Sequence, residues 1–258
     1  MIWQPTSGCG PHCYAEDGPR VRYALWRLPL LIGVLAVAAL TVPVLRGAAV
    51  RLAARGVLAS LGVRLQVRGP APRAGSLLVA NHVSWLDVVA LLAIGRMRLV
   101  AKHDVRGWPV IGAMAAGAGA IFLDRSRPKT LPTTVAEVSA ALRDGRSVAV
   151  FPEGTTFCGA DRGRFRPAVF QAAVDARAPV VPVAIRYDST AVAFVGAETL
   201  WSSVLRVART RSLAMTVITA PALHPADGAV RGALARAAQS SVGLRSAPGR
   251  VADLGLAA

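Results

Sequence analysis

The feature that most restricts the fold is an alternation of short apolar runs with helix-length segments, which begins after Leu61. Helical length and pattern are found in segments 85–93, 130–143, 166–176 and 228–242. Strands that alternate with helices predict an α/β domain with a mostly parallel mixed sheet flanked by helices, and place functional groups at the strand ends. The runs that fit buried strands are Val63 to Val67, Ser76 to Ala80, Arg98 to Ala101, Ala120 to Leu123, Ser147 to Phe151, Val180 to Arg186 and Leu213 to Thr219.

An apolar segment precedes this domain. Leu28 to Leu45 is a run of 18 uncharged residues with arginines on both sides. A helix that crosses a bilayer needs about 20 apolar residues, so this run is borderline for a span and equally fits a helix embedded in one leaflet. A secretory signal competes, but the long polar stretch before the run is unlike a signal peptide. The run therefore predicts attachment to the cell membrane, and the arginines that follow it predict that the bulk of the chain lies on the cytoplasmic face.

A second helix is expected over 47–61, with Arg51 and Arg55 on a face of their own. Two readings stay open: a basic amphipathic helix on an anionic bilayer, or an ordinary helix packed on the core. The resulting organisation is a flexible N-terminal tail (1–22), a membrane-associated helical segment with an N-terminal helix pair (23–61), an α/β domain (62–245) and a flexible C-terminal tail (246–258).

The charge balance restricts the partners. There are 30 Lys and Arg residues against 14 Asp and Glu, a net charge of +16, which favours anionic partners such as nucleic acid, acidic lipid or phosphorylated small molecules. Nucleic-acid binders interleave aromatic and basic residues, whereas this chain is 5% aromatic and spreads its arginines evenly. Nucleic acid is therefore not expected, and anionic membrane lipid is.

Three cysteines, Cys9, Cys13 and Cys158, are too few for a disulfide framework. Cys9, His12 and Cys13 lie close together in the sequence, but they supply at most three ligands at a spacing unlike the usual zinc knuckles. An unstructured tail is the preferred interpretation of this segment, and no metal site is expected.

The segment VANHVSWLD offers the clearest chemistry. His82 follows a predicted strand, and Asp87 enters the first turn of a predicted helix. A histidine can take a proton from a hydroxyl, and a carboxylate on its other nitrogen would fix the tautomer and stabilise the imidazolium. The alternative is structural: Ser84 and Asp87 form a capping box, and His82 is a buried loop residue.

Three further segments place polar or unusual residues at strand ends. Arg125 closes the run GAIFLDR, where a guanidinium group can clamp a phosphate or a carboxylate. Glu153, Gly154 and Thr155 lie in a turn after another strand; Glu153 is expected to hold the neighbouring arginine, and Thr155 to meet an anion. Pro182 interrupts an apolar run, which favours a bulge or an edge strand beside a pocket.

Together these blocks resemble the lysophospholipid acyltransferase family, which includes the 1-acylglycerol-3-phosphate acyltransferases. NHVSWLD at 81–87, GAIFLDR at 119–125, FPEGT at 151–155 and VPVAI at 181–185 match its four ordered blocks, and AKHDVRGWPVIG from Ala101 to Gly112 resembles a further segment. The resemblance covers roughly residues 60 to 220. It implies acyl transfer from acyl-CoA or acyl carrier protein (acyl-ACP) to a lysophospholipid hydroxyl, with no other cofactor and no metal.

The resemblance also implies roles for single residues. His82 would be the general base and Asp87 its orienting partner, while Arg125, Glu153, Gly154, Thr155 and Pro182 would contact the substrates. Lysophosphatidic acid, giving phosphatidic acid, is the leading acceptor. Because Thr156 and Phe157 stand where many members carry arginine, a lyso-ornithine lipid is the alternative acceptor. A non-catalytic protein that binds anionic membranes is the alternative from another class.

Overall fold

The computed structural model describes residues 6–14, 21–45, 47–108, 111–124 and 127–246. Its centre is one sheet in the order β1-β7-β6-β2-β5-β3-β4, in which β6 and β7 are antiparallel and all other neighbours are parallel. The predicted α/β class with a mostly parallel mixed sheet is confirmed. The strands are β1 (Val63–Arg68), β2 (Leu77–Ala80), β3 (Arg98–Lys102), β4 (Ile121–Leu123), β5 (Val148–Val150), β6 (Val180–Tyr187) and β7 (Leu213–Thr219).

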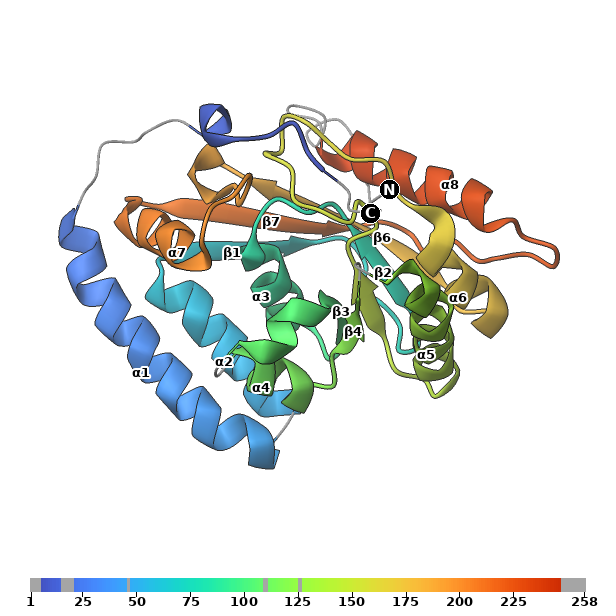
Figure 1. Cartoon of the computed structure of the whole chain (residues 1–258), viewed down its shortest axis with the longest axis horizontal. Helices are drawn as coiled ribbons and strands as arrows, with labels where there is room; N and C mark the ends of the chain where they lie inside the picture. Colours follow the sequence, from blue (N-terminus) through green and yellow to red (C-terminus); the bar gives the residue numbers. More distant parts are fainter. Residues whose placement is uncertain (1–5, 15–20, 46, 109–110, 125–126, 247–258) are drawn as a thin grey trace, which may run out of the picture.

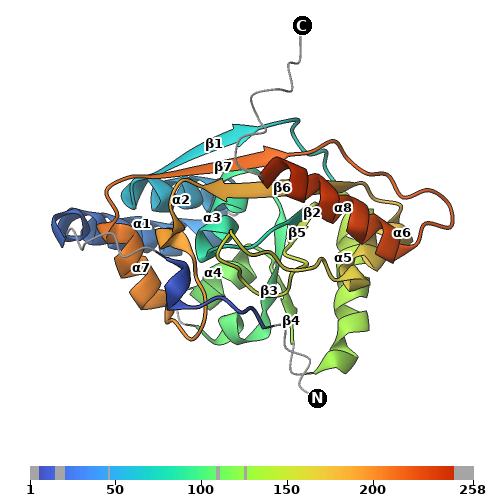
Figure 2. The same ribbon diagram turned by 90° about the horizontal axis from the view of Figure 1, so that it is seen from above.

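Helices cover both faces of the sheet, in two layers visible in Figures 1 and 2. On one face a core joins α1, α2, α3 and α7 to alternate strand residues such as Leu78 and Val183. On the other face α5, α6 and α8 pack on the intervening residues, such as Leu77 and Val79. Burial on both faces explains why the strands read as continuous apolar runs. The helices are α1 (Val21–Leu45), α2 (Gly47–Ser60), α3 (Trp85–Ile94), α4 (Ile111–Gly117), α5 (Leu131–Arg143), α6 (Phe170–Ala176), α7 (Leu200–Arg209) and α8 (Arg231–Ser246).

The helix α1 contains the apolar segment and lies outside α2 (Figure 1). It is the one helix among the described residues that is long and apolar enough to cross a membrane, judged by length and composition alone. Arg27 joins it to the domain, because the buried guanidinium donates hydrogen bonds to the carbonyls of Ala208, Thr210 and Arg211 at distances of 2.6–3.2 Å. These carbonyls lie at the C-terminal end of α7, where a cation is favoured.

The helix α2 combines the two readings that its sequence left open. Ala54, Val57 and Leu58 are buried against the core, while Arg51 and Arg55 are exposed. Arg55 nonetheless donates a 3.1 Å hydrogen bond to the carbonyl of Ala93 at the end of α3. The helix is therefore packed on the domain and still presents a basic face.

The expected flexible tail is wrong for residues 6–14. A 3-10 turn at Pro11–Cys13 is closed by a 2.9 Å hydrogen bond from the amide of Cys13 to the carbonyl of Gly10. Cys9 is 5% exposed and contacts Cys158, and the ring of Tyr14 lies 4.2 Å from the guanidinium carbon of Arg206. The tail prediction failed because these contacts are made to residues far along the chain. The rest of the predicted N-terminal tail before α1, and residues 247–258 of the C-terminal one, lie outside the described residues.

The edge-strand prediction for Pro182 is also wrong, because β6 lies between β7 and β2. Pro182 is buried opposite Val79 of β2, and its carbonyl accepts a 2.8 Å hydrogen bond from the amide of Ala220. The pairing of β6 with β7 begins one residue later, at Val183. The missing N–H of the proline therefore falls at the end of that ladder, where it leaves no strand residue unpaired.

Candidate active site

The site is built at the carboxyl ends of the neighbouring parallel strands β2 and β5. His82 follows β2, and its Nδ1 lies 2.9 Å from Oδ2 of Asp87 in the first turn of α3. Asp87 is fully buried, whereas the His82 side chain is 18% exposed. The ring also stacks on Phe151, with centroids 3.9 Å apart and planes inclined by 15°. Because Nδ1 faces the carboxylate, Nε2 is the nitrogen left for a substrate.

Asp87 makes the contacts that both of the alternatives left open by the sequence would require. Its Oδ2 accepts hydrogen bonds from the amides of Val83 at 2.6 Å and Ser84 at 2.8 Å, so the capping box predicted for α3 is present. The same oxygen faces the His82 ring. The helix cap thus holds the carboxylate where it can orient the imidazole.

Tyr187, at the end of β6, is a site residue that the sequence interpretation missed. Its hydroxyl donates a 2.5 Å hydrogen bond to Oδ1 of Asp87, so both carboxylate oxygens have partners. Burial, together with the charge of Asp87, raises the pKa of Tyr187 well above its ordinary value. The phenol therefore stays protonated at neutral pH and donates to the carboxylate.

Asn81 fixes the position of the segment that carries His82. Its side-chain amide donates a 3.0 Å hydrogen bond to the carbonyl of Ile185, and its oxygen accepts one of 2.8 Å from the amide of the same residue. The side chain thereby takes the place of a ladder residue and joins the end of β2 to β6. In the sequence, Asn81 stands out only as part of the NHVSWLD motif.

The loop after β5 holds the main chain of His82. Oε2 of Glu153 accepts a 2.6 Å hydrogen bond from the amide of His82, and Oε1 accepts one of 3.0 Å from the amide of Gly163. Further along the loop, the amide of Phe157 donates a 2.8 Å hydrogen bond to the carbonyl of His82. Glu153 is 4% exposed, and this burial raises its pKa to about 7, against the two backbone amides, which favour the ionised form.

The other predicted site residues lie in different surroundings. Gly154 closes the turn after β5, where its φ of +78° suits glycine and its amide donates to the carbonyl of Phe151 at 3.1 Å. Thr155 is partly exposed beside it, and Pro182 is buried within the sheet. Arg125 follows β4 and lies outside the described residues. The substrate contacts assigned to these residues stay predictions.

Thr156 and Phe157, which replace the expected arginine, have structural partners in this chain. The Thr156 hydroxyl donates a hydrogen bond to the carbonyl of Phe194. The Phe157 amide is the donor to His82 described above. The two positions therefore brace the loop and carry no positive charge toward the site.

Comparison with known proteins identifies the family of this chain. Residues 64–186, from β1 to β6, match the Acyltransferase family. A lyso-ornithine lipid O-acyltransferase of Pseudomonas aeruginosa is 35% identical over 193 residues, which are 72% of this chain and 73% of the relative. The chain belongs to the lysophospholipid acyltransferase family. A 1-acyl-sn-glycerol-3-phosphate acyltransferase of Neisseria meningitidis is 41% identical over 147 residues, 56% of this chain and 58% of the relative.

A solved structure extends the family likeness to the fold. The crystal structure of the 1-acyl-sn-glycerophosphate acyltransferase of Thermotoga maritima superposes with a TM-score of 0.65 and covers 88% of this chain and 96% of that one. At 17% identity, this likeness concerns the fold alone. The chain spans 58% of the length of the two Neisseria relatives that it matches.

Proposed function

We propose that this protein transfers a fatty acyl group from acyl-CoA or acyl-ACP to the free hydroxyl of a lysolipid. The observation that carries the proposal is the His82–Asp87 pair, with Nδ1 held 2.9 Å from a buried carboxylate and the ring partly open to solvent. This is the geometry of a general base whose tautomer is fixed by its partner.

The proposed reaction needs no covalent enzyme intermediate. Nε2 of His82 takes the proton of the acceptor hydroxyl while the oxygen attacks the thioester carbonyl. The carbon–sulfur bond then breaks, and the imidazolium returns the proton to the departing thiolate, which leaves an ester and a free thiol. Asp87 stabilises the imidazolium between these two transfers.

Lysophosphatidic acid is the proposed acceptor, and phosphatidic acid the product. Both acyl donors and this acceptor carry negative charge, which suits a chain with a net charge of +16. Arg125 is proposed to bind the acceptor phosphate, with Glu153, Gly154 and Thr155 shaping the same pocket and Pro182 the acyl site. The Neisseria meningitidis relative supports this acceptor by its name.

A lyso-ornithine lipid is a second candidate acceptor. The relative from Pseudomonas aeruginosa carries this activity in its name, and its match to this chain covers 73% of the relative's length. Thr156, where many family members carry arginine, hydrogen-bonds within the protein, so it adds no charge for a phosphate. An acceptor with an amine headgroup loses nothing by that substitution.

We also propose that the protein acts at the cytoplasmic face of the cell membrane. The helix α1 exposes large apolar side chains, and Leu52 of α2 is exposed beside them. An apolar surface of this kind, bordered by basic residues, suits an anionic bilayer. The α1 residues are Leu25, Trp26, Leu30, Ile32, Val37, Leu40, Val44 and Leu45. Vesicle flotation tests this attachment: Leu40→Glu with Val44→Glu should lower binding to anionic vesicles, and unchanged binding would contradict it.

The decisive experiment compares wild type with His82→Ala and with His224→Ala, a matched change at an exposed histidine. Each protein is incubated with labelled acyl-CoA and lysophosphatidic acid, and labelled phosphatidic acid is measured. Loss of a general base predicts a fall of about 10²- to 10⁴-fold in His82→Ala, with His224→Ala near wild type. Wild-type turnover in a folded His82→Ala protein would reject the mechanism. Binding without turnover in all three proteins, with acyl-ACP as well, would favour the non-catalytic alternative.

A comparison of acceptors separates the two candidates. With one donor, lysophosphatidic acid and lyso-ornithine lipid are offered separately, and kcat/KM is compared. A higher value for lysophosphatidic acid supports the leading proposal, and a higher value for the ornithine lipid replaces it.

A further inference from the structure

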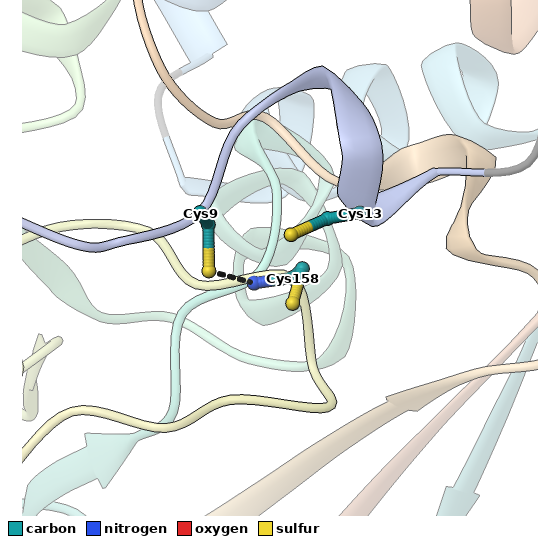
Figure 3. A group of neighbouring side chains, drawn as sticks. All are labelled: Cys9, Cys13 and Cys158. Atoms are coloured by element: carbon teal, nitrogen blue, oxygen red, sulfur yellow. Dashed lines mark hydrogen bonds between the residues drawn. The ribbon is translucent and has the colours of Figure 1, made fainter.

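All three cysteines of the chain meet at one place (Figure 3). Cys9 and Cys13 come from the N-terminal segment, and Cys158 comes from the loop after β5. Their three sulfur atoms lie within 4.8 Å of one another. Cys9 and Cys158 are buried, and Cys13 is partly exposed. Residues separated by 149 positions in the sequence thus contribute to a single cluster.

Ordinary packing does not account for this arrangement. A buried cysteine can act as a small apolar residue, but its reactivity, which includes metal binding, more often decides its role than its packing does. Here all three thiols of the chain lie in one cluster, where the N-terminal residues 6–14, which contain only a 3-10 turn, lie on the loop after β5. A disulfide would use two of the sulfurs and leave the third without a role.

We infer that Cys9, Cys13 and Cys158 form a binding site for a thiophilic divalent cation such as zinc. Thiolates are the ligands that select such ions. Although Cys9, His12 and Cys13 together are not spaced as in a zinc knuckle, the three residues between Cys9 and Cys13 are within the range for a single pair of zinc ligands. The 3-10 turn at Pro11–Cys13 makes the second thiol return beside the first. Residues 9–13 alone predict no metal site, because they supply at most three ligands; the fold adds the thiol of Cys158 to them.

The distances suit the ion. Thiolates at about 2.3 Å from zinc in a tetrahedron lie roughly 3.8 Å apart, so the sulfurs need to approach by about 1 Å at most. A fourth donor is near, since Oδ2 of Asp161 lies 3.9 Å from Sγ of Cys9. Asp161 is exposed, so either its carboxylate or a water molecule completes the tetrahedron.

Such a site would fasten the N-terminal segment to the loop that holds His82. Cys158 directly follows Phe157, whose amide bonds the carbonyl of His82, and the same loop carries Glu153. The segment has a second attachment where Tyr14 lies on Arg206. Metal removal would therefore loosen the loop as well as the segment.

The first test is the metal content of the full-length protein, purified without a polyhistidine tag. We expect about one zinc per chain in wild type and in His12→Ala, a matched change in the same turn at an exposed side chain. Cys13→Ser and Cys158→Ser should each lose most of the metal. Cys13→Ser is the safer variant, because Cys13 is partly exposed and does not lie in the loop after β5 that contacts His82. Less than a tenth of an equivalent in wild type, or full metal in both serine variants, would overturn the proposal.

The second test uses cobalt as a probe and does not depend on acyl transfer. Chelator-treated wild type is titrated with Co²⁺, which should produce thiolate-to-cobalt charge-transfer absorption that saturates at one equivalent. Chelation should lower the thermal midpoint, and added Zn²⁺ should restore it. No such absorption, or a disulfide among these cysteines in protein purified under reducing conditions, would reject the metal site.

Discussion

Replacement of Asp87 by asparagine tests the proposed chemistry while it preserves the helix cap. The carboxamide oxygen can still accept from the amides of Val83 and Ser84, which lie 2.6 and 2.8 Å from Oδ2. The amide nitrogen then faces the hydroxyl of Tyr187, which can accept as well as donate. The oxygen opposite Nδ1 of His82 is thus retained, and with it the tautomer. The variant should fold.

What the substitution removes is the negative charge beside the imidazolium. An ion pair separated by roughly 4 Å gains about 4 kcal/mol at an effective dielectric constant of 20. This value applies because Asp87 is fully buried and Nδ1 lies 2.9 Å from its oxygen. At 1.36 kcal/mol per factor of ten, the loss corresponds to a fall of roughly 10³-fold in kcat.

The assay measures the initial rate of ester formation over a range of pH, together with the thermal midpoint of each variant. We expect kcat to fall roughly 10³-fold in Asp87→Asn, with KM for the acyl donor changed little, because the carboxylate lies behind the histidine. Tyr187→Phe removes one hydrogen bond to Oδ1 and leaves the charge, so its kcat should fall by about tenfold. A folded Asp87→Asn protein within tenfold of wild type would refute the reasoning.

Three other changes test the scaffold. Burial raises the pKa of Glu153 from 4.5 to about 7, so the folded protein binds this proton more tightly than the unfolded chain does. The contribution of Glu153 to the free energy of unfolding should therefore fall by roughly 3 kcal/mol as the pH rises from 4.5 to 7. Thermal melts over this pH range should show that slope in wild type and lack it in Glu153→Gln. Arg27→Ala leaves the carbonyls at the end of α7 without their donor, which should lower the free energy of unfolding by about 3 kcal/mol. The expected readouts are a lower thermal midpoint and faster proteolysis after α1. Gly163→Ala places a methyl carbon 2.4 Å from the Phe157 ring and should lower kcat without removing vesicle binding, whereas wild-type kinetics would contradict the proposed role of this loop.

The chemistry that could be predicted from the sequence is local in the chain. His82 and Asp87 are five positions apart, and a strand followed by a helix is enough to bring them together. Tyr187 required more, since its role depends on β6 lying beside β2. Alternation along β6 does place Tyr187 on the same face as Val183 and Ile185, toward α3, so the sequence pattern carried part of the signal.

Other features depend on contacts that no local pattern contains. The sequence predicts a bulge or an edge strand at Pro182 because proline lacks a donor, but the neighbouring ladder ends beside it, so an interior strand tolerates it. Cys158 is 149 residues from Cys9, and only the fold makes them neighbours. The helices α4 and α7 are not among those expected, and α7 shows its importance through the carbonyls that it offers to Arg27.

The position of the His82 ring follows from three segments that the sheet order brings together. His82 lies at the end of β2, where its neighbour Asn81 is hydrogen-bonded to β6. The loop after β5 forms hydrogen bonds with both the amide and the carbonyl of His82. The first turn of α3 then supplies the carboxylate that orients the ring. Each contact also stabilises the fold, so stability measurements alone cannot separate a structural histidine from a catalytic base. The charge-removing Asp87→Asn variant can separate them, because it retains the hydrogen-bonding oxygen and changes only what an imidazolium would require.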